Sequence, residues 1–133
     1  MPLIDKIAWL HLHEGRLLST RSRGKDRYYI PGGKREAGET DAQTLLREIK
    51  EELTVDLDLA TVVHAGTFTA PAHGHAQGVL VQMTCYYAEY TGTLQPAAEI
   101  EEVVWLTYHD RPAVSAVDQL IFDWLREQQL LAG

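Results

Sequence analysis

The sequence predicts an α+β fold in which a strand-rich chain carries two amphipathic helices, one against each face of a sheet. Apolar residues recur at helical spacing over residues 40–53 and 115–130, whereas shorter apolar segments with strand character fill the rest. The length of 133 residues suits one domain, residues 1–133, with its own hydrophobic core. No internal repeat or linker divides the sequence, so we expect a single compact unit.

The first third of the chain is predicted to form strands. Residues 6–12 and 16–22 are two strand segments joined by a turn at Glu14 and Gly15. Residues 28–30 form a further short strand, which leads into a turn at residues 31–33.

Residues 40–53 are predicted to form the first helix. Thr40 and Gln43 have the spacing of a capping box, in which each side chain binds the backbone N–H of the other residue. Asp41 then places a negative charge at the positive end of the helix dipole. One face of the helix is apolar and is expected to pack on the sheet; it consists of Ala42, Leu45, Leu46, Ile49 and Leu53.

The chain then returns to the sheet. Residues 56–59 begin this return, residues 62–69 form a strand, and residues 70–78 form a loop rich in small residues. Residues 79–90 are predicted to be the longest strand, with Cys85 as a small buried apolar residue rather than a nucleophile. Its buried face is expected to hold Val79, Val81, Met83, Cys85 and Tyr87.

The last quarter contains a strand and the second helix. A turn at Thr91 and Gly92 leads to an acidic loop that runs into a strand ending at Leu106. Residues 115–130 form the helix, and Ser115 with Asp118 indicates its N-cap. Its core stripe is predicted to be Val117, Leu120, Ile121, Trp124 and Leu125.

Composition and charge exclude several classes of protein. Apolar residues make up 45% of the chain and charged residues 23%, which is typical of a soluble globular protein. The net charge of −7 argues against a nucleic-acid-coating protein, which needs a basic face. A single cysteine cannot form an intramolecular disulfide, and no signal peptide or membrane-spanning run is present in the sequence. We therefore expect a cytoplasmic protein without a membrane partner.

Three glutamates gather on the first helix. Glu48, Glu51 and Glu52 have the spacing i, i+3 and i+4, so their side chains converge on one patch beside the apolar face. Like charges at this spacing are unfavourable by about 0.2–0.5 kcal/mol in an isolated helix. A hard dication such as Mg²⁺ would remove the repulsion, because it binds carboxylate oxygens, phosphates and water. The alternative is an acidic face exposed to solvent.

The stretch from residue 33 to residue 55 resembles the Nudix box of the Nudix hydrolases, whose pattern is G-x5-E-x7-R-E-U-x-E-E-x-G-U, with U a bulky aliphatic residue. Many fixed residues at fixed spacing make this a specific motif. The matching residues are Gly33, Glu39, Arg47, Glu48, Ile49, Glu51, Glu52 and Val55, and Thr54 stands where the family usually has glycine.

The resemblance implies a Nudix-like α/β/α sandwich around a mixed β-sheet and a hydrolase that depends on Mg²⁺ or Mn²⁺. It implies that Glu51 and Glu52 bind the metal ion and that Glu48 is a ligand or the base that deprotonates water. Arg47 would orient a glutamate and contribute to catalysis, as would Glu52. The resemblance also implies a metal contact from the Gly32 carbonyl and a supporting role in the loop for Gly33 and Glu39.

Residues outside the box supply further candidates. Arg21 and Arg23 belong to a basic cluster that is either a solvated loop or a contact for substrate phosphates. Tyr29 either packs in the core or lies under a base or ribose. His73 and His75 are either a polar surface loop or a contact for the substrate, and a zinc site is disfavoured because further ligands are missing nearby.

An additional glutamate outside the box acts in some Nudix enzymes. In this chain Glu102 is the candidate for a further metal ligand or for the activation of water, and Glu99 and Glu101 are open alternatives. The alternative is that these glutamates form a solvent-exposed rim of the loop.

The function implied is hydrolysis of a diphosphate linkage in a nucleoside diphosphate derivative, such as a nucleoside triphosphate or a nucleotide sugar. A small-molecule nucleotide is therefore the expected partner, and a homodimer is left open. One alternative is a catalytically silent nucleotide sensor, which the intact Arg47, Glu48, Glu51 and Glu52 disfavour. Another is an enzyme acting on RNA 5′ ends, which the net negative charge disfavours.

Thr54 raises the question of how the first helix ends. A left-handed residue often ends a helix, and glycine adopts this conformation without the strain that a β-branched residue suffers. Thr54 either holds the strained conformation or continues directly into an extended segment. We expect the second, because no glycine lies between Gly38 and Gly66 and residues 55–57 alternate as a strand would.

Overall fold

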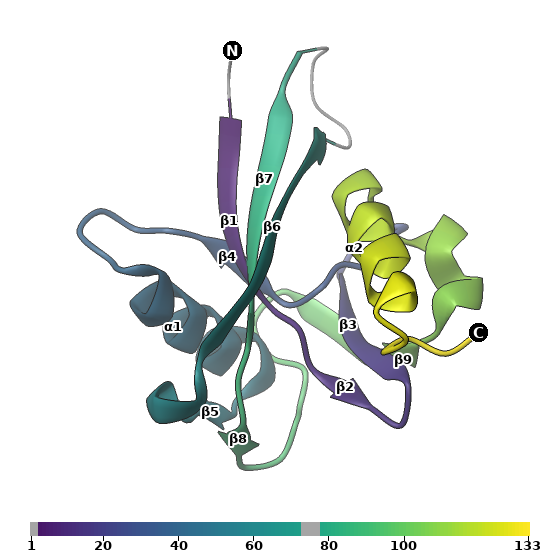
Figure 1. The fold of residues 1–133 in the computed structure, drawn as a ribbon. Coiled ribbons are helices and arrows are strands. Elements are labelled where there is room, and N and C mark those ends of the chain that lie inside the picture. Colours follow the sequence, from purple (N-terminus) through teal and green to yellow (C-terminus); the bar gives the residue numbers. More distant parts are fainter. Residues whose placement is uncertain (1–2, 73–77) are drawn as a thin grey trace.

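A mixed sheet lies between the two helices of the computed structural model, which describes residues 3–72 and 78–133 (Figure 1). The strand order in this sheet is β4–β1–β7–β6. Helix α1 (Asp41–Leu53) covers one face and helix α2 (Ala116–Glu127) covers the other. This arrangement confirms the predicted α+β class and the α/β/α layering.

The central strand is β1 (Leu3–Trp9). It runs parallel to β7 (Leu80–Tyr87) and antiparallel to β4 (Gly32–Lys34), which makes the sheet mixed, as predicted. The edge strand β6 (Val63–Pro71) pairs antiparallel with β7.

Two smaller sheets complete the fold. The first has the order β2–β3–β9, and its middle strand has the bounds predicted from the sequence. The second pairs β5 with β8, and two short 3-10 helices link the strands. The bounds are β2 (Leu12–His13), β3 (Arg16–Ser22), β9 (Ile100–Leu106), β5 (Asp56–Leu57), β8 (Tyr90–Thr91), η1 (Leu59–Thr61) and η2 (Tyr108–Ala113).

The predicted strand over residues 6–12 is displaced, because the chain changes sheets after Trp9. β1 pairs with β7 from Leu3 to Trp9, and the next strand, β2, pairs with β3 instead. At the crossing, the Leu10 N–H donates to the Tyr86 carbonyl at 2.9 Å.

The predicted strand over residues 79–90 is interrupted at residues 88 and 89. The Ala88 carbonyl accepts from the Trp9 indole N–H at 3.0 Å, and the Glu89 N–H donates to Thr61 Oγ1 at 2.8 Å. These backbone groups are bonded outside the sheet and cannot extend the pairing with β6. β7 therefore ends at Tyr87, and β8 begins at Tyr90.

Residues 31–33 were expected to form a turn, and this prediction is wrong for the two glycines. Gly32 and Gly33 belong to β4 and pair with Ala8 and Ile7 of β1. Gly32 has φ +149°, and a Cβ on it would lie 2.0 Å from the Ile7 carbonyl oxygen. Only glycine allows the chain to approach β1 this closely at that position.

The predicted start of α1 is confirmed. Thr40 Oγ1 accepts from the Gln43 N–H at 3.1 Å, and Gln43 Oε1 accepts from the Thr40 N–H at 2.9 Å. The apolar face is buried most deeply at Leu45, Ile49 and Leu53, as expected from the spacing.

The predicted end of α1 is wrong, because Thr54 is left-handed, with φ 63° and ψ 17°. Its N–H donates to the Lys50 carbonyl and its Oγ1 donates to the Thr93 carbonyl at 3.2 Å. A distant segment therefore holds the strained residue in place, and the local sequence does not reveal that segment.

Helix α2 is shorter than predicted, and its buried face differs. It ends at Glu127, not near residue 130, and Leu120 is exposed, whereas Phe122 is fully buried. Ser115 is the N-cap, but its side chain makes no capping hydrogen bond. Asp118 instead accepts from the Ile30 N–H at 2.9 Å.

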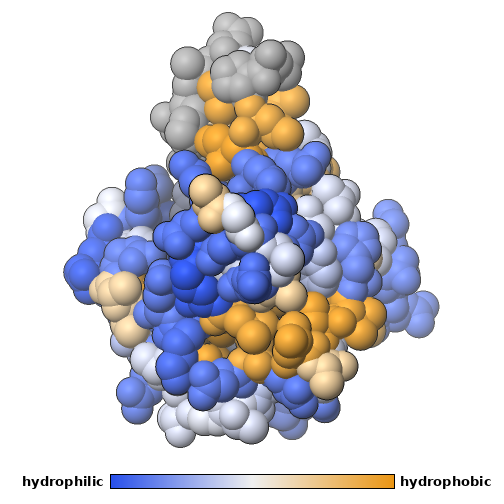
Figure 2. Space-filling view, turned by 90° about the vertical axis from the view of Figure 1, so that its left-hand side faces the viewer, coloured by the Kyte–Doolittle hydropathy of each residue, from blue (hydrophilic) through white to orange (hydrophobic). Residues whose placement is uncertain are grey.

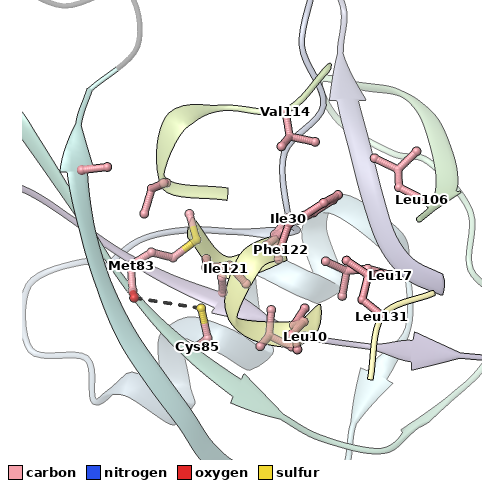
Figure 3. Close-up of a cluster of buried hydrophobic side chains, with 14 of the residues drawn as sticks. Leu10, Leu17, Ile30, Met83, Cys85, Leu106, Val114, Ile121, Phe122 and Leu131 are labelled. Carbon is pink, nitrogen blue, oxygen red and sulfur yellow. Dashed lines mark hydrogen bonds between the residues drawn. The ribbon is translucent and has the colours of Figure 1, made fainter. Parts of the chain in front are cut away.

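The core on the α2 side of the sheet contains side chains from early, middle and late parts of the sequence, such as Leu10, Met83 and Phe122 (Figure 3). Met83, Cys85 and Phe122 belong to this cluster, and Cys85 is fully buried, as predicted. On the other side, Figure 2 shows a largely hydrophilic surface with one apolar area in its upper part and another across its lower part. Among the described residues, no helix is long and apolar enough to cross a membrane.

Candidate functional site

A pocket of about 360 Å³ lies where β1, β4 and α1 meet the start of α2. Its lining combines charged and apolar residues. Its charged lining contains three carboxylates and three amines, which are Glu48, Glu52 and Glu99 and Lys6, Lys25 and Lys34. Its apolar lining includes Ile4, Ala72, Val81, Met83 and Val117.

The contact between β4 and α1 brings Glu48 over the glycines. A Cβ on Gly33 would lie 2.2 Å from Glu48 Oε2, so the carboxylate occupies the space that any side chain would need. Gly33 therefore supports the site by leaving room for Glu48.

Arg47 holds the loop and the helix together. Its Nε donates to Glu39 Oε2 at 2.7 Å and its Nη2 donates to Glu39 Oε1 at 2.9 Å, a bidentate pair. Its Nη1 donates to Glu48 Oε1 at 2.9 Å, and Nη2 also reaches the Lys34 carbonyl at 3.1 Å. Arg47 thus orients Glu48, the arrangement expected from the resemblance.

Glu39 secures the loop before α1. It accepts from the Glu36 N–H at 2.8 Å and from Thr44 Oγ1 at 2.9 Å, in addition to Arg47. The hydrogen bonds from Arg47 contribute most to lowering the pKa of Glu39 to about 2. Glu39 therefore stays ionised across the ordinary pH range.

Glu52 is the most buried carboxylate of the site, with 7% of its surface exposed. Its Oε1 accepts from the Gly32 N–H at 3.2 Å. Burial raises the pKa of Glu52 to about 8, and the negative charges of Glu48 and Glu99 act in the same direction. The chain alone therefore stabilises the ionised carboxylate of Glu52 less than water does.

Glu48 and Glu51 differ in their surroundings. Burial raises the pKa of Glu48, while Arg47 opposes the change. The Glu51 side chain is 54% exposed and lies 3.5 Å from Arg47 Nη1. The convergence predicted from helical spacing thus brings Glu48 and Glu52 into the pocket and leaves Glu51 at its outer side.

The donor set fits a hard divalent cation held jointly by protein and substrate. Among the described residues, no three carboxylate, histidine or cysteine side chains are close enough to form a metal site alone. Mg²⁺, however, commonly takes one or two carboxylates and completes its shell with phosphates and water. Glu48 and Glu52 provide that pair, and a cation would offset the desolvation that raises both pKa values.

Of the glutamates outside the helix, Glu99 lines the pocket and Glu102 does not. Glu102 Oε1 accepts from Arg21 Nε at 2.9 Å and from the Tyr28 hydroxyl at 2.7 Å. The pKa of Glu102 is lowered, chiefly by Arg21. Glu102 is thus engaged elsewhere, so the preference for it over Glu99 is not supported by the geometry.

Two neighbouring segments position Glu99. The Gln95 and Ala97 N–H groups donate to the last carbonyls of α1, those of Leu53 and Glu52, at 3.1 and 3.0 Å. Two residues later, the Glu99 carbonyl accepts from the Arg23 N–H at 2.9 Å. The backbone around Glu99 is therefore held by both α1 and the β3–β4 connection.

The basic and aromatic candidates differ in whether they line the pocket. Arg21 pairs with Glu101 and Glu102 and is not in the pocket lining, and Arg23 contributes its backbone N–H to Glu99. Tyr29 does line the pocket. The histidine candidates, His73 and His75, lie outside the described residues.

Sequence reasoning missed Lys6 and Asp118, which are charged residues within apolar patterns. Lys6 interrupts an apolar strand and lines the pocket. Asp118 interrupts the buried face of α2, and burial raises its pKa to about 7. A charged residue at a position where the pattern requires an apolar one was the available signal.

Comparison with known families and curated proteins agrees with this geometry. The family model of the NUDIX domain matches residues 6–125. The CTP pyrophosphohydrolase of Escherichia coli (strain K12) is 31% identical over 110 residues, which cover 79% of this chain and 76% of that protein.

Solved structures share the fold. The solution structure of the E. coli ORF135 protein matches with a TM-score of 0.74 and 24% identity, covering 97% of this chain and 94% of that one. The crystal structure of a MutT NUDIX hydrolase from Burkholderia pseudomallei matches with a TM-score of 0.77 and 18% identity. That match covers 92% of this chain and 98% of the other.

Proposed function

Because this chain belongs to the Nudix family and is a pyrophosphohydrolase of that type, we propose that it hydrolyses a diphosphate linkage in a small nucleotide with the help of a divalent metal ion. The observation that carries the proposal is the pair of desolvated carboxylates, Glu48 and Glu52, in a pocket of suitable size. Ligand pockets commonly measure about 300–1,000 Å³.

Glu48 and Glu52 would hold the metal ion, with Glu51 and the Gly32 carbonyl as further donors. Mg²⁺ or Mn²⁺ suits these oxygen ligands, and such an ion, when bound, polarises phosphate oxygens and lowers the pKa of bound water. The hydrogen bond from the Gly32 N–H fixes one oxygen of Glu52. The other oxygen is left for the ion.

The remaining residues orient groups and accept a proton. Arg47 fixes the direction of Glu48 through its hydrogen bond to Oε1. Glu48 or Glu99 accepts the proton of the attacking water, and both line the pocket. A raised pKa brings Glu48 closer to neutrality and so makes it a better general base.

The substrate proposed is a nucleoside triphosphate, with cytidine triphosphate as the first candidate. The similarity to a CTP pyrophosphohydrolase supports this choice. The apolar lining residues and Tyr29 offer surfaces for a base and a sugar. The products would be a nucleoside monophosphate and pyrophosphate.

The test is a panel of nucleotides incubated with the protein and Mg²⁺ or Mn²⁺, with products identified by phosphorus NMR. The panel contains nucleoside triphosphates, nucleotide sugars and capped RNA ends. We expect metal-dependent release of pyrophosphate, fastest with a nucleoside triphosphate. Two variants with the same change of charge test which glutamate outside the box contributes to catalysis. Glu99→Gln should reduce turnover, whereas Glu102→Gln, outside the pocket, should retain it.

Saturable nucleotide binding without hydrolysis under any metal condition would contradict the proposal and indicate a sensor domain. Equal turnover with and without a chelator would contradict the metal requirement. Preferential cleavage of RNA ends would support hydrolysis of a diphosphate linkage but contradict a nucleoside triphosphate as the substrate.

A further inference from the structure

Two lysines face each other across the pocket wall. Lys6 of β1 and Lys34 of β4 are direct partners in the antiparallel register, and both line the pocket. Like charges directly opposite each other on neighbouring strands are destabilising. We refer to these two residues as the lysine pair.

The lysine pair differs from Lys50 in its ionic contacts. Among residues 3–72 and 78–133, neither ammonium group makes an ion pair, whereas Lys50 lies 3.1 Å from Asp56. The Lys6 ammonium lies 5.8 Å from the centre of the Tyr29 ring. Burial also lowers the pKa of Lys6, although the nearby charge of Asp118 opposes this change. An anion between the two lysines would offset both the repulsion and the desolvation.

The backbone on both sides of the pair is firmly held. Lys6 lies in the central strand, paired on one side with Met83 and on the other with Lys34. The Lys34 carbonyl accepts from Arg47 Nη2 at 3.1 Å, and the same guanidinium orients Glu48. Arg47 therefore links the backbone at Lys34 to the carboxylate of Glu48.

The balance of charge indicates which ligand belongs there. The pocket lining holds three lysines beside three glutamates, although the whole chain carries a charge of −7. A nucleoside triphosphate has more negative charge than a single dication neutralises. The remaining phosphate charge needs cationic side chains on the pocket wall, where Lys supplies a compact charge with three donors.

We propose that Lys6 and Lys34 together bind the phosphate groups of the substrate and make its phosphate chain, more than its base, the main determinant of affinity. This inference rests on the proposed function, since it assigns the ligand chemistry of the same pocket. Lys6 is the central residue, because it lies on an interior strand of the sheet and its ammonium group lies near the Tyr29 ring.

The test measures binding of products and fragments, so that it does not depend on turnover. Lys6→Met and Lys34→Met remove a charge at nearly constant length, and Lys50→Met is the matched control on the outside of α1. Calorimetric titrations with inorganic pyrophosphate, cytidine 5′-monophosphate and cytidine, each with Mg²⁺, separate phosphate from base. Thermal unfolding confirms that each variant folds.

We expect Lys6→Met to weaken binding of pyrophosphate and of the monophosphate by about 10- to 100-fold, as for loss of a hydrogen bond to a charged group. Cytidine affinity should not change, and Lys6→Arg should restore part of the loss. Lys34→Met should act in the same direction, and Lys50→Met should match the wild type. If Lys6→Met fails to fold, Lys34→Met, at an exposed position, provides the same comparison.

Unchanged pyrophosphate affinity in both pocket variants would overturn the inference, as would failure of the wild type to bind any phosphate-bearing probe. Equal losses for cytidine and its monophosphate, with pyrophosphate unaffected, would show that Lys6 contacts the base instead. Failure of the proposed function has a different result: pyrophosphate would bind in a Lys6-dependent way, and the NMR panel would show no hydrolysis.

Discussion

Replacing Glu52 with Gln is expected to stabilise the metal-free protein while abolishing activity. The Glu52 carboxylate is 7% exposed, and its pKa is raised from 4.5 to about 8. The folded state thus binds a proton more tightly than the unfolded chain, so Glu52 costs stability as pH rises from about 4.5 to 8. At pH 7 this cost is about 3 kcal/mol.

Gln removes the charge and keeps an oxygen for the Gly32 N–H. Urea unfolding in a chelator should therefore show Glu52→Gln more stable than wild type by about 3 kcal/mol at pH 7. The two should be nearly equal below pH 4.5, where Glu52 is protonated in both states. In a thermal melt at pH 7, the difference corresponds to about 10 °C.

Glu51→Gln is the matched control, because it makes the same change one residue away on a side chain that is 54% exposed. Its stability should stay close to wild type at every pH. Adding Mg²⁺ should then stabilise the wild type more than Glu52→Gln, because the variant has lost a ligand charge. A wild type at least as stable as Glu52→Gln in chelator at pH 7 would refute this reasoning.

Three further changes test the site and the helix end. Glu48→Gln should remove or shift the acidic limb of kcat/KM against pH, because that limb reports an essential base; an unchanged profile would leave Glu48 as a ligand only. Gly33→Ala should lower turnover by orders of magnitude in a metal-saturated assay, since its Cβ would lie 2.2 Å from Glu48 Oε2; near-normal turnover would show that the carboxylate moves freely. Thr54→Gly should raise the free energy of unfolding by about 1 kcal/mol in urea, because relief of left-handed strain exceeds the lost hydrogen bond to Thr93. A loss of stability there would mean that the hydrogen bond dominates, and turnover should stay within a few-fold either way.

Local patterns predicted the elements whose contacts lie close in sequence. The capping box at Thr40 and the strand from residue 16 to residue 22 depend on neighbouring residues and on simple periodicity, and both are confirmed. Helical spacing likewise predicted that Glu48 and Glu52 share a face of α1, and both line the pocket.

Features that depend on distant segments could not be predicted in this way. Thr54 adopts its left-handed conformation where residues 93–97 bind the end of α1. Gly32 becomes part of a strand because β1 lies against it. Glu99 enters the pocket and Glu102 pairs with Arg21, a distinction that depends on the path of the chain after β8. Composition and spacing contain no information on these encounters.

The anchoring of the segment before β9 has a consequence for how such a site can diversify. Ala97 is tied to the last turn of α1 and Glu99 to Arg23, so only Ala98 separates the two anchor points. That single residue acts as a spacer of fixed length. Lengthening it by one residue would rotate Glu99 away from the pocket while leaving the box residues on α1 undisturbed. A carboxylate at the position of Glu99 can therefore be gained, lost or relocated by insertions and deletions at one position, independently of the helix that carries the motif.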